Sequence, residues 1–219
     1  DDLFAANLQR LTEVSDLVDR DLRRPLQLTA NLRADLVTPE MCRLLRRIGV
    51  VFCQLGLESG SDRVLTWLKR RTTTAATNQA ALDMLTEHGI RAIGSFIIGA
   101  PNEEEEDLAR TYDFVRRNLR SGRMMAFSFG PLVAFPGTEV WQQARARGLV
   151  DERTLDWRSL DIDLRHFDLQ RYTLLGPLSR PRFGDWFRRF HDLWEEARDA
   201  LERPRPVAAP APEIAGQEG

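Results

Sequence analysis

Segments with the apolar pattern of strands alternate along the chain with segments that have helical spacing. The nearly continuous apolar runs at 50–58 and 91–99 are typical of strands buried on both faces of a sheet. Two further segments, 26–31 and 124–133, also have strand character. Apolar residues recur at helical spacing in the segments 5–21, 39–48, 75–88 and 103–120. Because a helix lies in each gap between strands, the pattern predicts a parallel sheet with helices outside it, which is an α/β fold.

Local signals mark where several of these helices begin and end. Thr38 and Pro39 suit the N-cap and the first position of the helix at 39–48, and Gly49 suits its end. Thr138, in a rigid turn after the last predicted strand, is expected to cap another helix.

The number of units sets the expected architecture. Four strand–helix units amount to half of an eight-stranded barrel, so residues 1–150 are predicted to form a partial (β/α) barrel with parallel strands and outer helices. Residues 151–202 are predicted to form a mostly helical C-terminal extension, in which an amphipathic helix over 182–202 carries an aromatic stripe. Residues 203–219 are rich in Pro and Ala, which predicts a disordered tail. No strand precedes the first helix, so we expect the C-terminal part of a larger protein or a partner-dependent piece.

Composition narrows the class of protein. The 219 residues include 31 Lys and Arg against 33 Asp and Glu, a net charge of −2, which argues against a nucleic-acid binder. No apolar run approaches the roughly 18–20 residues needed to span a bilayer, so no membrane partner and a cytoplasmic location are expected. Cys42 and Cys53 are too few for a disulfide-rich scaffold or for a metal site of three or four cysteines from this chain.

Candidate chemistry lies where the predicted strands end, because ligands of parallel α/β folds bind at the carboxyl ends of the strands. Glu58 ends an otherwise apolar strand and shares a face with Gln54 and Gly56. Its carboxylate could bind two hydroxyls or an amine of a small molecule, or it could belong to a structural ion pair. The small residues Ser59 and Gly60 leave room there for a ligand.

The next strand offers an apolar surface. Ser95, Ile97 and Gly99 share one face, and an isoleucine between small residues suits a planar ring such as adenine, although ordinary core packing explains the same pattern. One of the cations at 69–71 could pair with a ligand carboxylate, or all three could form a solvated charge run. The histidines lack metal-ligand spacing, so no metal ligands are predicted; they are His88, His166 and His191.

Several of these segments together resemble the radical S-adenosylmethionine (radical SAM) enzymes. The run Leu55–Leu65 (LGLESGSDRVL) is similar to the family's fourth-strand segment, and Gly94–Glu103 (GSFIIGAPNE) to its fifth. Similarity also covers Phe135–Thr138 after the sixth strand, Asn31–Asp35 at the third and Asp1–Phe4 at the second. The order and spacing agree over roughly residues 1–150, and the most similar subgroup often carries an N-terminal cobalamin-binding domain.

The resemblance implies roles for individual residues. Glu58 would contact the amino-acid or ribose part of S-adenosylmethionine, with Ser59 beside it, and Arg70 would hold the ligand carboxylate. Ser95 would lie near the ribose, Ile97 under the adenine and Gly99 at the end of that strand. The adenine edge would meet the backbone of Val133 and Ala134, and a ribose or methionine contact would come from Asn31 or Arg33.

One departure from the family is large. The family's Cys-x3-Cys-x2-Cys motif, which holds a four-iron four-sulfur cluster, is absent from this sequence. The resemblance therefore implies a C-terminal fragment that is not active alone, taken from a parent enzyme that uses S-adenosylmethionine, the cluster and, in this subgroup, cobalamin. A cobalamin-dependent methyltransferase that acts on a small-molecule or peptide substrate is the parent expected. The partner would be the missing N-terminal half or another chain.

Two alternatives remain at this point. The chain could be a non-catalytic α/β half-barrel that binds a partner chain along its open edge. It could also be an unrelated α/β small-molecule binder that keeps an adenine-binding surface.

Overall fold

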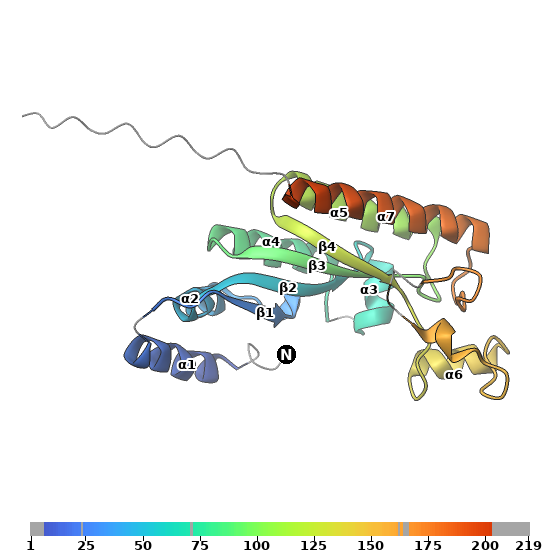
Figure 1. The fold of residues 1–219 in the computed structure, drawn as a ribbon, viewed down its shortest axis with the longest axis horizontal. Helices are drawn as coiled ribbons and strands as arrows, with labels where there is room; N and C mark the ends of the chain where they lie inside the picture. The colour runs from blue at the N-terminus through green and yellow to red at the C-terminus, as the bar shows by residue number, and fades with distance from the viewer. Residues whose placement is uncertain (1–6, 23, 71, 162, 164–166, 203–219) are drawn as a thin grey trace, which may run out of the picture.

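The computed structural model describes residues 7–22, 24–70, 72–161, 163 and 167–202, and these form one four-stranded parallel sheet with helices against it (Figure 1). The strands lie in chain order, β1-β2-β3-β4, so each strand pairs with the next one along the chain. This is the arrangement of part of a (β/α) barrel, and it confirms the predicted fold class. The strands are β1 (Leu28–Leu32), β2 (Val50–Glu58), β3 (Arg91–Ile98) and β4 (Met124–Pro131).

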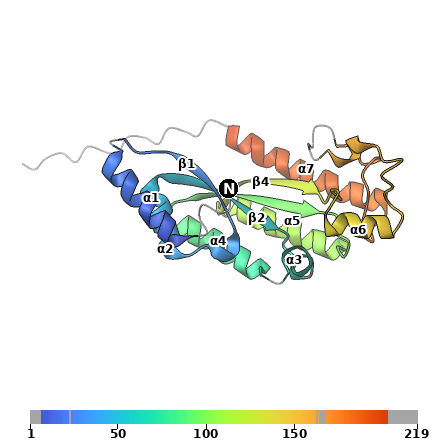
Figure 2. The ribbon, with the colours of Figure 1, turned by 90° about the horizontal axis from the view of Figure 1, so that it is seen from below.

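Helices cover one face of this sheet (Figures 1 and 2). The helices that contact strands are α2 (Pro39–Ile48), α4 (Ala75–Glu87), α5 (Glu105–Arg120) and α7 (Arg180–Glu202), while α1 (Leu8–Asp21) packs against α2. Two short helices, α3 (Asp62–Lys69) and α6 (Glu139–Ala146), follow the carboxyl ends of β2 and β4. None of the helices in the described part of the chain is long and apolar enough to cross a bilayer.

The core lies between the sheet and these helices. Every second residue of β2 near its carboxyl end, namely Cys53, Leu55 and Leu57, is fully buried there. Phe96 of β3 meets Phe114 of α5 edge to face, with ring centroids 6.2 Å apart. Phe129 of β4 packs against the aromatic stripe of α7, so the C-terminal helix belongs to the same core as the sheet.

The opposite face is where the sequence-based prediction was wrong. Burial on both faces was expected for 50–58 and 91–99, but Gln54 of β2 is exposed. Asn31 of β1 and Ser128 of β4 are exposed as well. On this open face β2 has a large apolar side chain only near its start, which is Phe52. The guanidinium of Arg91 covers it, 3.8 Å from the centroid of the Phe52 ring. The sheet therefore presents a polar face toward the place where the remaining strands of a closed barrel would curve round.

Helix caps follow the sequence signals. The Thr38 hydroxyl accepts a hydrogen bond from the backbone N–H of Met41, and Thr138 does the same for Trp141, both at 3.1 Å. Gly49 ends α2 in the left-handed region with φ of 102°, and a Cβ there would lie 2.4 Å from the carbonyl oxygen of Leu26. This glycine lets the chain turn from α2 into β2 against the residues before β1.

The structure differs from the expected elements in few places. Helix α3 was not predicted, β4 ends at Pro131 rather than at 133, and α7 begins at Arg180. Between α6 and α7 the chain is irregular apart from a 3-10 turn, η2 (Trp157–Leu160). A 3-10 turn, η1 (Ala34–Leu36), also follows β1. Several predictions fall outside the described residues: those for Asp1–Phe4, Arg71, His166 and the 203–219 tail.

Replacing Gly49 tests the junction between α2 and β2. We expect Gly49→Ala to lower the free energy of unfolding by about 2 kcal/mol or more, because it adds a left-handed alanine and a clash with backbone. Gly89→Ala is the matched control, since Gly89 has φ of 68° with open space at its Cβ position. Urea denaturation of both variants measures the difference in their free energies of unfolding. An equal loss of stability in both variants would contradict a clash between the new Cβ and the carbonyl oxygen of Leu26.

Candidate functional site

Glu58, the last residue of β2, lies on the open face at the carboxyl end of the sheet. Its backbone is left-handed, with φ of 62°, and the ladder with β3 is irregular between Gly56 and Glu58. The Nζ of Lys69, the last residue of α3, lies 2.9 Å from its Oε1, and both side chains are partly exposed. A Cβ on Gly56 would come within 2.6 Å of the same oxygen, so this glycine makes room for the carboxylate.

Buried hydrogen bonds hold the backbone on both sides of Glu58. The side-chain amide of Asn78, on α4, donates to the carbonyl oxygen of Leu57 at 2.8 Å. The hydroxyls of Ser59 and Thr111 lie 2.9 Å apart, and the N–H of Gly60 donates to Thr111 at 3.0 Å. The predicted contact residue Ser59 is therefore fully buried against α5 and does not line the open face.

Asp107, in the first turn of α5, completes this connection. Its carboxylate accepts hydrogen bonds from the Ser61 hydroxyl at 2.6 Å, from the Arg63 guanidinium and from the N–H of Glu104 at 2.9 Å. Burial alone would raise the pKa of Asp107, but the hydrogen bonds from Arg63 and Ser61 outweigh it and hold that pKa below its ordinary value. The loop that carries Glu58 is thus tied to α5 by a charged, buried group.

A row of polar side chains crosses the open face next to Glu58. The side-chain amide of Gln54 donates to the hydroxyl of Ser95 at 2.9 Å, and the hydroxyl of Ser128 donates to Ser95 at 3.1 Å. Asn31 pairs with Gln54 in the strand register, so it extends this row to β1. Asn31 and Ser95, predicted separately from the sequence, therefore belong to one surface.

An apolar surface lies on the same face beyond Ser95. Ile97 is half-buried there, and it pairs in register with Gly130 of β4. A Cβ on Gly130 would meet nothing within 4 Å, so the space beside Ile97 is open. Glu58, Ser95 and Ile97 thus combine a carboxylate, a hydroxyl and a flat apolar patch on neighbouring strands.

Other predicted residues are buried where β3 and β4 end. Gly99 is buried with φ of 89°, and a Cβ there would come within 2.6 Å of the Tyr172 hydroxyl of the C-terminal extension. Val133 and Ala134, which follow β4, are buried, and Ala134 belongs to a separate small cluster with Trp141. The side chains of Val133 and Ala134 therefore face the interior at the carboxyl end of the sheet, and the expected contact of their backbone with an adenine edge stays a prediction.

The cations Lys69 and Arg70 lie against different carboxylates. Arg70 caps α3 in a left-handed conformation, its side chain is 86% exposed, and its guanidinium lies 3.4 Å from Glu139. Lys69 contacts Glu58 instead. The guanidinium of Arg33 donates a hydrogen bond to the Asp35 carboxylate at 2.8 Å. This bond, with a smaller contribution from the positive charge of Lys69, lowers the pKa of Asp35.

The two cysteines cannot hold a cluster in this fold. Cys42 of α2 and Cys53 of β2 are both fully buried in the core between the helices and the sheet, and burial raises the pKa of Cys42 to about 11 and of Cys53 to about 12. No group of three or more His, Cys, Asp or Glu in the described residues is placed to bind a metal ion. The residues of this chain therefore do not fit a cluster that needs three exposed thiolates.

Glu103 is a feature that the sequence pattern hid within an acidic run. It is 1% exposed, its carboxylate accepts a hydrogen bond from the N–H of Gly99, and Tyr172 lies near it. Burial raises the pKa of Glu103 to about 8, although the hydrogen bonds from Gly99 and Ala100 lower it in part. Its position four residues after Gly99 was the available signal, because a carboxylate at that spacing can cap the turn that ends β3.

The chain matches one protein family and several known proteins. The family described as the radical SAM superfamily matches residues 4–115. An uncharacterized methyltransferase of Pyrococcus horikoshii is 26% identical over 180 residues, which are 80% of this chain and 38% of that protein. Bacteriochlorophyllide d C-12(1)-methyltransferase of Chlorobaculum tepidum is 26% identical over 147 residues, 67% of this chain and 28% of that protein.

A solved structure shows the same fold. TsrM, a radical S-adenosylmethionine methyltransferase from Kitasatospora setae with cobalamin and a 4Fe-4S cluster bound, superposes with a TM-score of 0.55 at 20% identity. The match covers 72% of this chain and 32% of TsrM. This chain therefore spans about a third of the length of the relatives that it matches.

The buried Glu103 gives a pH-dependent stability that a neutral side chain removes. A carboxyl whose pKa is about 8 when folded and near its ordinary 4.5 when unfolded binds more protons in the folded state between these values. Stability should therefore fall as pH rises from about 5 to about 8, by up to about 1.4 kcal/mol per pH unit. Denaturant unfolding of the native chain and of Glu103→Gln at several pH values measures this loss. The native chain should lose stability relative to the variant; parallel pH profiles would contradict a buried, protonated Glu103.

Proposed function

Because the chain belongs to the radical SAM superfamily, we propose that it forms four adjacent strands of the S-adenosylmethionine-binding barrel of a methyltransferase-type enzyme. The observation that supports this most is the placement of Glu58, Ser95 and Ile97 on one open face at the carboxyl ends of parallel strands. The methyltransferases among its relatives suggest the reaction type.

The chemistry of this face suits each part of S-adenosylmethionine. Ile97, with the open space over Gly130, would support the flat adenine ring, and the Ser95 hydroxyl would meet the ribose. Glu58 and Lys69 present opposite charges 2.9 Å apart. A zwitterionic amino acid complements such a pair, because the carboxylate accepts from an ammonium while the lysine donates to a carboxylate.

We assign the contact with the carboxylate of S-adenosylmethionine to Lys69, whereas the family resemblance implies Arg70. Lys69 already touches Glu58, while Arg70 lies on the outside against Glu139. Arg70 would need a different backbone conformation at the end of α3 to reach the open face. Asn31 and Arg33, at the end of β1, would border the same ligand at its ribose or methionine part.

The cluster and the cobalamin belong to the proposed parent enzyme rather than to these residues. Since Cys42 and Cys53 do not fit a cluster, we infer that three thiolates from outside this chain would hold it, and that this chain is not active alone. Cobalamin, which TsrM binds, is proposed for the parent on that likeness, and no residue of this chain is assigned to it. A small-molecule or peptide substrate would occupy the remaining open face.

The free edge of β1 favours a second candidate function. Among the described strands β1 pairs with β2 alone, so one edge of the sheet offers unpaired backbone groups. A missing N-terminal half or a partner chain could add parallel strands there. A half-barrel that binds such a partner without catalysis would keep this edge but would not need Glu58 and Ser95 to recognise a nucleoside.

Binding of S-adenosylhomocysteine separates these two functions. We expect weak but saturable binding by ligand-detected NMR, with Glu58→Gln weakening it at least about tenfold, because the variant loses the charge that meets the ligand ammonium. Glu40→Gln, on the exposed surface of α2, is the control and should bind as the native chain does.

The opposite result has a clear meaning. If Glu58→Gln and Glu40→Gln bind the ligand equally, or if Ile97→Glu leaves binding intact, the open face is not an S-adenosyl site. Circular dichroism of each variant confirms that the fold is retained.

A further inference from the structure

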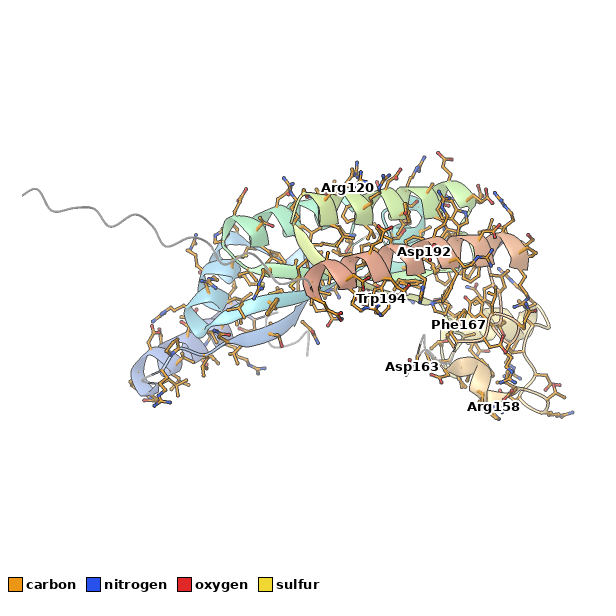
Figure 3. The ribbon with its side chains drawn as sticks, turned by 45° about the horizontal axis from the view of Figure 1, so that its top comes forward. Arg120, Arg158, Asp163, Phe167, Asp192 and Trp194 are labelled. Atoms are coloured by element: carbon orange, nitrogen blue, oxygen red, sulfur yellow. The ribbon has the colours of Figure 1, made fainter. Side chains whose placement is uncertain are left out.

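A groove runs between α5 and α7 at the opposite end of the sheet from Glu58. It has a volume of about 720 Å³ and lies at the amino ends of β3 and β4, since Arg91 and Met124, the first residues of these strands, line it. The two helices lie side by side over this region, and Figure 3 labels Arg120 on α5 beside it. This groove is separate from the proposed S-adenosylmethionine site, which lies on the open face at the carboxyl ends.

Arginines dominate the rim of the groove. Arg116 and Arg120 come from α5 and Arg189 from α7, while Glu196 is the one acidic residue among the lining residues described. Arg91 of β3 also lines the groove, but its guanidinium lies over the Phe52 ring on the open face of the sheet. Within the described part of the chain, Arg116, Arg120 and Arg189 form no ion pair with a carboxylate, unlike Arg110, Arg182 and Arg188 on the same two helices. The rim therefore has positive charge that the fold itself does not neutralise.

The rim is not explained by helix capping alone. Arg116 and Arg120 lie near the end of α5, where cations favour the helix dipole. Arg189 lies in the middle of α7, and its guanidinium is 4.3 Å from the centroid of the Trp186 ring and 5.5 Å from that of Tyr112. Stacking on two aromatic rings holds this cation at the groove rather than free in solvent.

The floor is apolar and has a helical repeat. Leu193, Ala197 and Leu201 of α7 are spaced four residues apart, so they form one ridge along the helix, and Leu119 and Met125 complete the floor. Leu201 is 42% exposed. From Arg189 to Leu201 the groove side of α7 is about 18 Å long at 1.5 Å per residue, which corresponds to more than three helical turns.

We propose that this groove binds an acidic amphipathic helix of a partner protein. An apolar ridge between two helices accepts the apolar face of a third, and the unpaired arginines complement glutamates or aspartates on the partner's flanks. An apolar floor distinguishes it from a surface for a nucleic-acid backbone, and the net charge of −2 also argues against general polyanion binding. The groove would link the barrel to a second protein without blocking the open face.

The test uses the 219-residue chain and a labelled probe. The probe is a fluorescein-labelled helical peptide with leucines on one face and glutamates elsewhere, and binding is measured by fluorescence anisotropy. The combined variant Arg116→Glu, Arg120→Glu and Arg189→Glu should weaken binding at least tenfold, because attraction at the rim becomes repulsion. The matched control reverses three exposed arginines of α1 and α2 instead, Arg10, Arg43 and Arg46, and should bind within about twofold of the native chain.

A second variant distinguishes docking in the groove from general attraction. Ala197→Arg adds positive charge but fills the floor, so it should weaken binding of the acidic peptide, whereas a purely electrostatic contact would become tighter. Circular dichroism checks that each variant is folded.

Several results would overturn the proposal. They are an equal loss in the matched control, tighter binding by Ala197→Arg, equal binding of a peptide with lysine in place of glutamate, and rim-dependent binding of a single-stranded RNA without peptide binding. Self-association that depends on the same arginines, with no peptide binding, would identify a second copy as the occupant and also contradict it.

Discussion

Successive side chains of a β-strand point to opposite faces, so burying Leu55 and Leu57 under the helices obliges Gly56 and Glu58 to occupy the other face. The same alternation places Phe96 in the core and Ser95 and Ile97 on the open face of β3. Because all four strands are parallel, their carboxyl ends meet at one edge. The packing of the helix layer therefore determines where the polar and charged groups of the proposed site lie.

Glu58 depends on a second constraint, which is the rigidity of the chain behind it. Its left-handed backbone is unfavourable for a residue with a Cβ. Asn78 donates a hydrogen bond to Leu57 before it, and Thr111 and Asp107 accept hydrogen bonds from Gly60 and Ser61 after it, so the turn is held in place. These partners come from α4 and α5, so two helices behind the sheet fix the position of the carboxylate. The arrangement is typical of a site that is preorganised by its scaffold.

Much of this fold could be predicted because its signals are local. The caps at Thr38 and Thr138, the glycine that ends α2 and the parity of β2 each depend on a few neighbouring residues. The prediction that β2 is buried on both faces was wrong. Its apolar run includes Phe52, which lies on the open face, but this ring is covered by the guanidinium of Arg91 rather than by a second layer of the fold.

The site itself was only partly predictable for a related reason. Glu58, Ser95 and Ile97 follow from parity, but Ser59 points into a helix interface that the sequence pattern does not reveal. Whether Lys69 or Arg70 reaches Glu58 depends on the left-handed end of α3, a helix that was not predicted. The burial of Glu103 and the groove between α5 and α7 depend on contacts between segments that are distant in the sequence, and hydrophobic periodicity does not reveal such contacts.

Thiol reactivity at neighbouring positions of β2 tests most directly whether the sheet has one covered and one open face. In a chain with Cys42→Ala and Cys53→Ala, the variant Gln54→Cys should react with a maleimide nearly as fast as an unfolded thiol, because Gln54 is exposed. In the native chain Cys53, one residue away, should remain unreactive until the protein unfolds, because it is fully buried. Protection of the cysteine at position 54 comparable with that of Cys53 would mean that the open face is covered, and the account of the site given above would be wrong.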